Sequence, residues 1–239
     1  LNVETELDST NAWLMQQDDW HGQVCLAEYQ HAGRGRRGRQ WVSPFAANLY
    51  LSLGWTFSLD AASLAGLSLA SGVAIMRALE RLGIQAAGLK WPNDIFHDGR
   101  KLGGILIEMR GQAGGPSQVV IGIGLNVKMP SSAAEQLDQP WSDLEQCAET
   151  KVSRNALAAA VISELVQVCH ACEQGAITTY LEAWQEYDIH AGKQVDLLLP
   201  DESRITGTSR GIDSQGALLL EKSGKVQRFN SGEVSLRGR

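Results

Sequence analysis

The segment from residue 28 to residue 41 reads EYQHAGRGRRGRQW and leaves few structures open to the chain at this point. Four arginines and three glycines in so short a run make a poor helix, strand or core, so the pattern predicts a loop. We expect positive φ and close approach of the backbone to a ligand at Gly33, Gly35 and Gly38. Planar, charged guanidinium groups bind phosphate or carboxylate oxygens well, and the segment has four of them, at Arg34, Arg36, Arg37 and Arg39. The segment therefore predicts an anion-binding loop that is mobile until its ligand binds.

This cluster of positive charge is a local exception in an acidic chain. The 239 residues include 21 basic and 27 acidic side chains, which gives a formal net charge of −6. A general nucleic-acid-binding protein usually spreads its basic residues over one face, so the charge balance argues against that class. The alternative for the segment is a solvated surface loop, an RNA-binding tract or a localisation signal.

Length and composition indicate an ordinary globular protein with one sizeable core and a small second module. No apolar run approaches the roughly 20 residues of a membrane-spanning helix. The N-terminus, LNVETE, lacks a basic region followed by an apolar one. We therefore expect a cytoplasmic protein without membrane contact.

The four cysteines are too few for a disulfide framework in a chain of this size. Cys169 and Cys172 flank His170, which invites a metal or redox interpretation. However, the sequence has no second close cysteine pair, and these residues fall in the last turns of a predicted helix. We expect the thiols to serve helix packing and not to bind a metal.

Hydrophobic spacing predicts the first elements. Ser9 and its polar neighbours are good caps for a helix that begins near Ala12. Strands are predicted at 24–29 and 48–54, on either side of the arginine loop. A helix is predicted from 60 to 82 with Gly83 as its stop, a long helix after the cap Ser153, and a shorter one over 177–187.

The middle of the chain predicts a sheet that carries a pocket. Pro92 interrupts the strand at 89–96 and leaves Lys90 and Asp94 at a bend, where they would hold a phosphate and its metal or simply form an ordinary turn. Asp98-Gly99 favours a tight hairpin. Strands are predicted at 101–108 and 118–127, and the alternation of side chains places Lys101 on the same face as Gly103. Glycines in both strands leave parts of the sheet without side chains, which predicts a floor for a flat ligand.

Residues 130–150 read as polar and irregular, apart from Trp141. Beyond Gly192, five short strands are predicted at 195–199, 205–212, 217–221, 226–229 and 233–236. Such a cluster indicates a small β-barrel attached as a separate module. We expect two domains, 1–189 and 190–239.

Five motifs in a fixed order resemble the signature of bacterial biotin protein ligases. They are STN at 9–11, EYQHAGRGRRGR at 28–39, KWPND at 90–94, RKLGGIL at 100–106 and GIGLNV at 122–127. The small β module follows where that family has an SH3-like domain. The resemblance implies an α+β fold, with a mixed but mostly antiparallel sheet like that of class II synthetases and a C-terminal SH3-like β-barrel.

The resemblance also implies a two-step reaction. Biotin and Mg-ATP would give biotinyl-5′-adenylate and pyrophosphate, and a lysine of the biotin carboxyl carrier protein of acetyl-CoA carboxylase would then attack the mixed anhydride. Bringing a carboxylate to an α-phosphate joins like charges, so fixed cations should stabilise the transition state. The catalytic candidates are Arg36, Lys101 and Lys90.

Ligand contacts carried over from the family fall into three groups. Biotin would be bound by Ser9, Thr10, Asn11, Gln30, Gly33, Arg34, Arg36, Lys101, Gly103, Gly104, Gly122 and Gly124. The nucleotide would be bound by Arg34, Arg36, Arg37, Trp41, Lys90, Asn93, Asn126 and Trp141, and Asp94 is the candidate ligand of Mg²⁺. Structural alternatives remain open, with Ser9 as a helix cap, Gln30 as a hydrogen bonder at a strand end and Trp141 as the anchor of a surface loop.

Longer members of the family carry a DNA-binding winged helix before the catalytic region, and the family resemblance favours a homodimer. This chain begins eight residues before Ser9, so we expect no operator binding by these residues alone, although an upstream winged helix would confer it. Two other functions are kept in view. A lipoate-type acyl ligase would use the same adenylate chemistry without the arginine loop, and a non-catalytic nucleic-acid module would use the loop without the glycine-floored pocket.

Overall fold

A seven-stranded sheet organises the first three quarters of the chain. The computed structural model describes residues 1–111, 115–134, 137, 139–148, 151–199, 203–230 and 235–238. The sheet has the order β1-β2-β3-β7-β6-β5-β4, with all pairs antiparallel except β1 and β2. Its strands are β1 (Asn2–Leu7), β2 (Val24–Gln30), β3 (Leu49–Phe57), β4 (Ala87–Lys90), β5 (Asp94–His97), β6 (Arg100–Gly111) and β7 (Ser117–Leu125). This confirms the predicted mixed, mostly antiparallel α+β fold.

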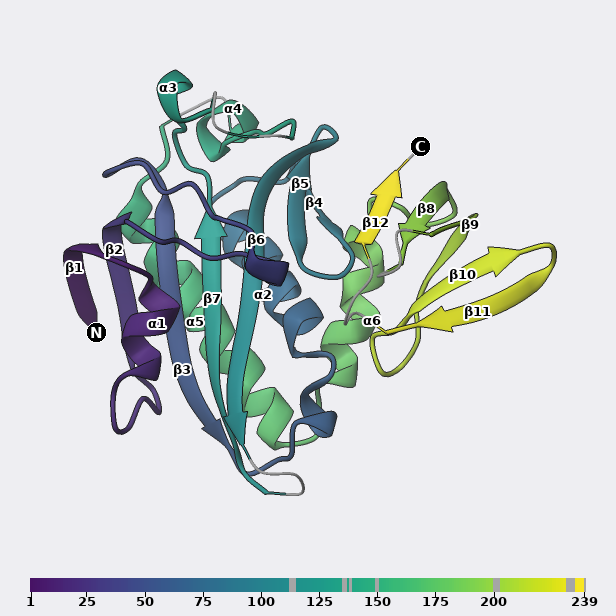
Figure 1. Cartoon of the computed structure of the whole chain (residues 1–239), viewed down its shortest axis with the longest axis horizontal. Helices are drawn as coiled ribbons and strands as arrows, with labels where there is room; N and C mark the ends of the chain where they lie inside the picture. The colour runs from purple at the N-terminus through teal and green to yellow at the C-terminus, as the bar shows by residue number, and fades with distance from the viewer. Residues whose placement is uncertain are drawn as a thin grey trace.

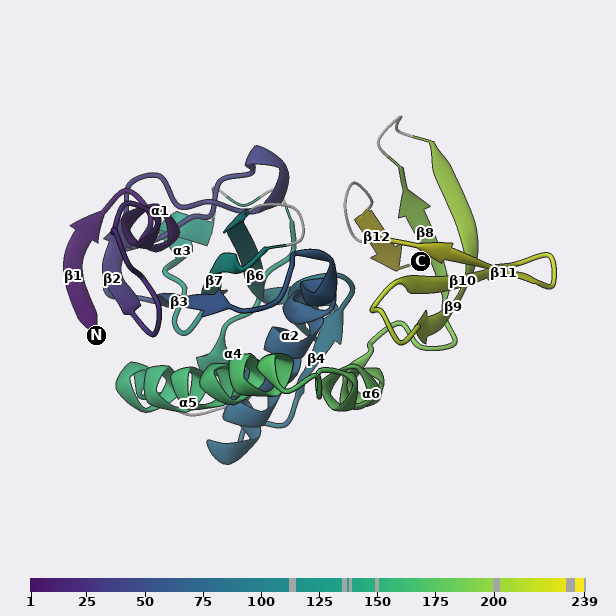
Figure 2. The same cartoon turned by 90° about the horizontal axis from the view of Figure 1, so that it is seen from below.

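The helices divide between the two faces of this sheet (Figures 1 and 2). On one face lie α2 (Leu67–Arg81) and α5 (Arg154–Glu173), which pack against each other and bury the main apolar core. On the other face lie the short α1 (Thr10–Met15) and the arginine loop, as the view from below shows. The open face between α1 and the loop is therefore where a ligand can reach the sheet.

Most predicted helices are confirmed, with one shifted boundary. Ser9 caps α1 and Ser153 caps α5 through their side chains, and α6 (Thr178–Tyr187) follows as expected. The helix predicted from 60 begins at Leu67, because a separate 3-10 turn (Ala62–Leu64) precedes it. The segment predicted as irregular contains two short helices, α3 (Ser131–Ala134) and α4 (Leu144–Ala148). The edge strand β1 was not predicted.

The predicted hairpin turn is confirmed, but the prediction that side chains alternate regularly along β6 is wrong. Asp98 and Gly99 have φ of 50° and 70°, which is the geometry of a tight two-residue turn between β5 and β6. The register of β5 on β6 then shifts between Ile95 and Phe96. Such a bulge reverses the faces of the residues that follow, so Gly103 lies on the opposite face from Lys101.

The C-terminal part forms a second, five-stranded antiparallel sheet in the order β11-β10-β9-β8-β12. Its strands are β8 (Gln194–Leu198), β9 (Arg204–Ile212), β10 (Leu218–Lys222), β11 (Lys225–Phe229) and β12 (Ser235–Gly238), which confirms the predicted cluster; residues 233 and 234 of the last predicted strand lie outside the described residues. Two hydrogen bonds join the β4–β5 hairpin to the segment before β8 and to the turn between β9 and β10. Ile189 N donates to Leu89 O at 3.0 Å, and Trp91 Nε1 donates to Gly216 O at 3.1 Å.

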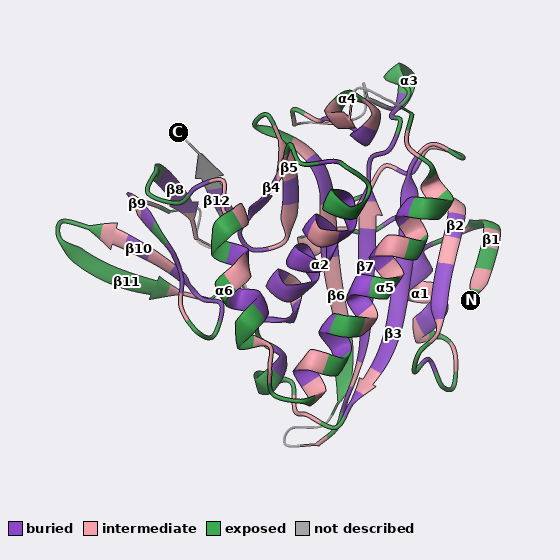
Figure 3. Ribbon diagram, turned by 180° about the vertical axis from the view of Figure 1, so that it is seen from behind, coloured by how far each residue is buried: buried purple, intermediate pink, exposed green. Residues whose placement is uncertain are grey.

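Among the described residues, two helices are long and apolar enough by composition to cross a membrane, although neither is an unbroken apolar run. They span Ala62–Arg81 and Arg154–Glu173. The most apolar window of the first is 72% buried inside the fold, and that of the second is 44% buried. Figure 3 shows α2 beside α5 with most of its residues buried, which is the position of a core helix. Cys169 and Cys172 are buried in α5, which confirms their packing role, and burial raises the pKa of the Cys172 thiol to about 12.

Candidate functional site

A pocket of about 160 Å³ opens on the sheet face that carries α1 and the arginine loop. Its walls come from the start of α1, the loop, the β4–β5 hairpin, the middle of β6 and β7, and Trp141. Most of the predicted ligand-binding residues line it, and the two exceptions are Gly33 and Gly103. The fold therefore brings together motifs that are more than a hundred residues apart in the chain.

One end of the pocket is a buried, uncharged hydrogen-bonding network. Gln30 Oε1 accepts from the Thr10 backbone N at 3.0 Å and from Thr10 Oγ1 at 3.2 Å. Ser52 Oγ lies 2.7 Å from Thr10 Oγ1 and donates toward Asn11 Oδ1 at 2.5 Å. All four residues are at least 92% buried. Groups fixed in this way can recognise an uncharged polar ligand without losing side-chain entropy.

Two members of this network were missed from the sequence. Ser52 is fully buried in β3, and Ser43 Oγ accepts from Gln30 Nε2 at 3.0 Å. A serine inside the apolar strand LYLSLGWTF was the available signal, because a buried hydroxyl needs a partner. Ser9 is confirmed as a helix cap, and its side chain also lines the pocket.

The glycine floor differs from the prediction. A side chain at Gly122 would meet the Asn11 amide at 2.2 Å, and one at Gly124 would meet the Trp41 ring at 2.5 Å. Gly103 faces the core, where a side chain would meet Leu125 at 2.5 Å. At Gly104 alone among these four, a Cβ would make only ordinary van der Waals contacts, with Asp94 and Trp41 nearest at 3.5 Å. Three of the four predicted floor glycines therefore make room for protein groups.

The arginine loop closes over the pocket through a 3-10 turn at Arg36–Gly38. Positive φ occurs at Gly38 and at Arg37, with values of 70° and 59°, so the prediction of positive φ at Gly33 and Gly35 is wrong. Gly33 is instead needed for close packing, since a side chain there would lie 2.4 Å from the Trp41 carbonyl oxygen.

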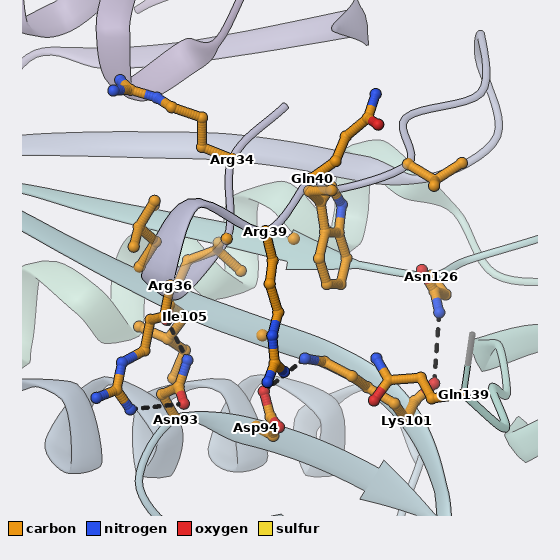
Figure 4. Close-up of a pocket in the computed structure, with 18 of the residues that line it drawn as sticks. Arg34, Arg36, Arg39, Gln40, Asn93, Asp94, Lys101, Ile105, Asn126 and Gln139 are labelled. Atoms are coloured by element: carbon orange, nitrogen blue, oxygen red, sulfur yellow. Dashed lines mark hydrogen bonds and ion pairs between the residues drawn. The ribbon is translucent and has the colours of Figure 1, made fainter. Parts of the chain in front are cut away.

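The arginines of the loop point in different directions (Figure 4). Arg36 Nη1 donates to Asn93 Oδ1 at 3.2 Å, and Asn93 Nδ2 donates to the Ile105 carbonyl at 2.8 Å. Burial, with Arg37 nearby, lowers the pKa of Arg36. Arg39 extends toward Asp94, whereas Arg34 points away from Asn93 and Asp94. The loop thus directs positive charge toward the hairpin from two of its arginines.

The cationic end of the pocket is centred on Lys101. Its Nζ lies 2.7 Å from Asp94 Oδ1 and 5.6 Å from the centre of the Trp41 ring. The side chains of Lys101 and Asp94 are only 15% and 19% exposed, so solvent screens this pair weakly. An ammonium has three donors, so Lys101 can bind a second anion while it remains paired with Asp94.

Lys90 is buried and lies at the far edge of the pocket. Its Nζ is 4.7 Å from the centre of the Phe96 ring, and the residue also lines a neighbouring cleft with His190. The ammonium therefore lies over Phe96, which is two residues along β5 from Asp94. Lys90 lines the same pocket as Lys101, and its role as a catalytic cation stays a prediction.

Asn126 and Trp141 form the wall beside the start of β6. Asn126 Nδ2 donates to the Ser142 carbonyl at 3.0 Å and to the Lys101 carbonyl at 3.4 Å, while its buried Oδ1 has no hydrogen-bond partner among the described residues. Trp141 pairs with Lys101 through an isolated β-bridge. Asn126 thus holds the wall in place and keeps one acceptor for a ligand.

The residues around Asp94 do not by themselves make a metal site. Within the described parts of the chain, no group of three histidine, cysteine, aspartate or glutamate side chains could hold a metal ion. The Asp94 carboxylate is also paired with Lys101. Mg²⁺ is often held by substrate phosphates together with one or two carboxylates, so a magnesium ion here would depend on the phosphates it accompanies.

Comparisons with known proteins agree with this geometry. Residues 4–126 match the biotin/lipoate A/B protein ligase family, and residues 190–237 match the biotin protein ligase C terminal domain. The bifunctional ligase/repressor BirA of Escherichia coli is 43% identical over 97% of this chain and 72% of its own length. The biotin--[acetyl-CoA-carboxylase] ligase of Mycobacterium tuberculosis is 33% identical, with coverage of 98% and 88%.

A solved structure shares the whole fold. The biotin protein ligase of Aquifex aeolicus in complex with biotin and ATP superposes with a TM-score of 0.84 at 26% identity, over 100% of this chain and 99% of that one. The fold and the pocket thus define a ligase of the biotin/lipoate A/B family, to which this chain belongs. The C-terminal match and these relatives place it among the bacterial biotin protein ligases, which confirms the resemblance seen in the motifs.

Proposed function

We propose that this chain activates biotin with ATP and transfers the biotinyl group to a lysine of the biotin carboxyl carrier protein of acetyl-CoA carboxylase. In the first step a biotin carboxylate oxygen bonds to the α-phosphorus of ATP, and the bond to the leaving pyrophosphate breaks. In the second step the lysine amine bonds to the acyl carbon, AMP leaves and the amine loses a proton. Family membership supports both steps, and the name of the mycobacterial relative supports the carrier protein as partner.

The observation that carries this proposal is the polarity of the pocket. Biotin has an uncharged ureido head and a charged carboxylate tail. The pocket has an uncharged buried end that suits the head and a cationic end that suits the carboxylate. We assign the head to Ser9, Thr10 and Gln30, with the Gly33–Arg34 backbone above it, and the floor at Gly104 to the ring system. Asn11 and Gly122 support the uncharged end by packing, and Gly124 makes room for Trp41. Lys101 and Arg36 then face the carboxylate.

The nucleotide is assigned to the opposite rim. Arg36, Arg37 and Lys90 would neutralise phosphate oxygens, Asn93 would hold Arg36 in place, and Trp41, Asn126 and Trp141 would contact the nucleoside. The unpartnered Asn126 Oδ1 supports this assignment. Mg²⁺ would arrive with the phosphates, and Asp94 remains the nearest carboxylate to receive it.

Pyrophosphate exchange into ATP tests the first step without the carrier protein. We expect exchange with biotin, none without an acid substrate, and none with lipoate. Exchange with lipoate alone would instead support the lipoate-type alternative, and absence of exchange with either acid would refute adenylate formation. Addition of the carrier protein should then give a biotinylated lysine that mass spectrometry identifies.

We also propose a homodimer in the cytoplasm. β6 has twelve residues but pairs with β5 only up to Gly104, so its second half has a backbone edge that no strand of the described sheet covers. Edges of this kind pair readily with a second copy. Sedimentation at several concentrations, with and without biotin, measures the association. Replacing Met109 on this edge with proline should weaken it.

The domain division at 189/190 and the lack of operator binding by these residues are part of the same proposal. The hydrogen bond from Trp91 Nε1 to the Gly216 carbonyl supports a defined contact between the two proposed domains. The net charge of −6 opposes DNA binding. A gel-shift assay with the biotin operator tests the second point, and expression of residues 1–189 alone tests the first.

A further inference from the structure

A carboxylate outside the predicted site joins two parts of it. Glu108 lies on β6, and its two oxygens have different partners. Oε2 accepts from Asn11 Nδ2 at 2.8 Å, and Oε1 lies 3.2 Å from Arg34 Nη1. One side chain therefore connects the first turn of α1 to the arginine loop.

On the α1 side, Glu108 reaches the buried hydrogen-bonding network. Asn11 is 3% exposed, and the absence of a side chain at Gly122 gives its amide the space that it occupies. Its Oδ1 accepts from Ser52 Oγ at 2.5 Å, so the amide is fixed at both ends. Asn11 Nδ2 also donates to the Leu106 carbonyl at 3.4 Å, so Glu108 supplies the shorter and charged one of its two acceptors, and losing that acceptor is costly for a buried amide.

On the loop side, Glu108 holds the neck of the arginine loop. Arg34 forms a β-bridge with Gln40, which brings the two ends of the loop together. Figure 4 shows the Arg34 side chain pointing away from the hairpin, whereas Arg36 and Arg39 extend toward it. Arg34 is therefore placed to fasten the loop to β6, and the other arginines are placed to face the anion.

We propose that Glu108 is a positioning residue that couples closure of the arginine loop to the network at the biotin end of the pocket. The inference rests on the proposed function, because it concerns the retention of biotin and its adenylate. The two contacts differ in strength. The pair with Arg34 is 41% and 24% exposed and should have a small effect, whereas the hydrogen bond to the buried Asn11 should have a larger one.

Three variants separate the two contacts. Glu108→Gln keeps an oxygen that accepts from Asn11 but removes the ion pair, so we expect the adenylate to dissociate about 3-fold faster with the KM for biotin changed less than about 2-fold. Arg34→Gln should give the same result. Glu108→Ala also removes the acceptor for Asn11, so the KM for biotin should rise about 10-fold.

The double variant Glu108→Gln with Arg34→Gln should release the adenylate no faster than either single variant, because both changes break the same contact. Glu221→Gln is the matched control, since it breaks an ion pair of similar exposure with Arg210 in the C-terminal sheet and should change neither quantity. Thermal unfolding confirms that each variant is folded.

Two outcomes would overturn the coupling. One is additive acceleration of release in the double variant, and the other is a Glu108→Ala enzyme with the KM and release rate of the parent. The parent enzyme is assayed alongside for biotin-dependent pyrophosphate exchange. Failure of the parent in that assay refutes the proposed function, whereas a working parent with indifferent Glu108 variants refutes only the role of Glu108.

Discussion

Two glycines on neighbouring strands should respond to the same substitution in opposite ways. Gly104 and Gly124 are directly opposite each other on β6 and β7. A methyl group at Gly124 would lie 2.5 Å from Trp41 Cε2 and 2.8 Å from Trp41 Nε1. A methyl group at Gly104 would have its nearest neighbours at 3.5 Å, which is an ordinary contact. Gly124→Ala should therefore strain the folded protein, and Gly104→Ala should not.

The magnitude follows from how far the Trp41 ring must move. Carbon atoms pack best at about 3.5 to 4.0 Å, so the ring would have to shift by about 1 Å. Its backbone is held, because Trp41 N donates to the Gly33 carbonyl at 2.8 Å and its own carbonyl accepts from Ser43 Oγ at 3.1 Å. Overpacking of this kind costs about 1 to 3 kcal/mol. Gly104→Ala should change the free energy of unfolding by less than about 1 kcal/mol.

Ligand binding should separate the two variants in a second way. The Gly104 methyl group would take up space in the pocket beside Asp94, Trp41 and Lys101, so we expect about 10-fold weaker biotin binding in a protein of normal stability. Urea unfolding followed by circular dichroism measures stability, and calorimetry measures biotin affinity. In a Trp41→Ala background the cost of Gly124→Ala should vanish. If that cost persists without the indole ring, Trp41 is not what Gly124 makes room for.

Three further outcomes are expected. Lys101→Ala should slow adenylate formation about 10²- to 10³-fold in single-turnover assays and weaken biotin binding far less, because its ammonium faces charge that develops during attack; equal losses in both would contradict this. Arg36→Gly should let biotinyl-adenylate escape and label lysines at random, which mass spectrometry of added bystander protein detects. Burial, with Lys90 and Lys193 nearby, lowers the pKa of His190 from 6.5 to about 4, so the unfolded state binds more protons in that interval. The free energy of unfolding should thus fall by about 2 kcal/mol from pH 7 to pH 5, and urea titrations should show a smaller fall in His190→Gln.

Local patterns allowed most helices and strands to be predicted, and the resemblance to biotin protein ligases implied the fold class and the pocket residues. Capping serines, apolar spacing and the Asp98-Gly99 turn each have one favoured geometry. Ordered motifs then indicated which loops and strands meet. The edge strand β1 escaped prediction because its pattern is largely exposed, with Val3 64% exposed, and a solvent-facing strand lacks a clear apolar alternation.

The detailed errors have one cause, which is that bulges and close packing depend on neighbouring segments. The register shift between Ile95 and Phe96 moved Gly103 to the core face, and nothing in the run KLGGIL marks it. Arg37 takes positive φ although two glycines are adjacent to the turn. The residues on either side of it are held, because Arg36 donates to Asn93 and the Arg39 backbone N donates to the Arg36 carbonyl. Such choices are made by tertiary contacts, which a single sequence does not display.

The charges at the loop give a physical reason to expect that closure and catalysis are coupled. Arg36, Arg37 and Arg39 repel one another along the short turn, and Asp94, the carboxylate that Arg39 approaches, is already paired with Lys101. The loop and the hairpin therefore hold more positive than negative charge when they meet. A carboxylate and a triphosphate between them supply the missing negative charge, so closure is favoured most when both substrates are present. We expect the same excess of positive charge to stabilise the attack of one anion on the other, so that closure would assemble the catalytic charges around the pair that must react.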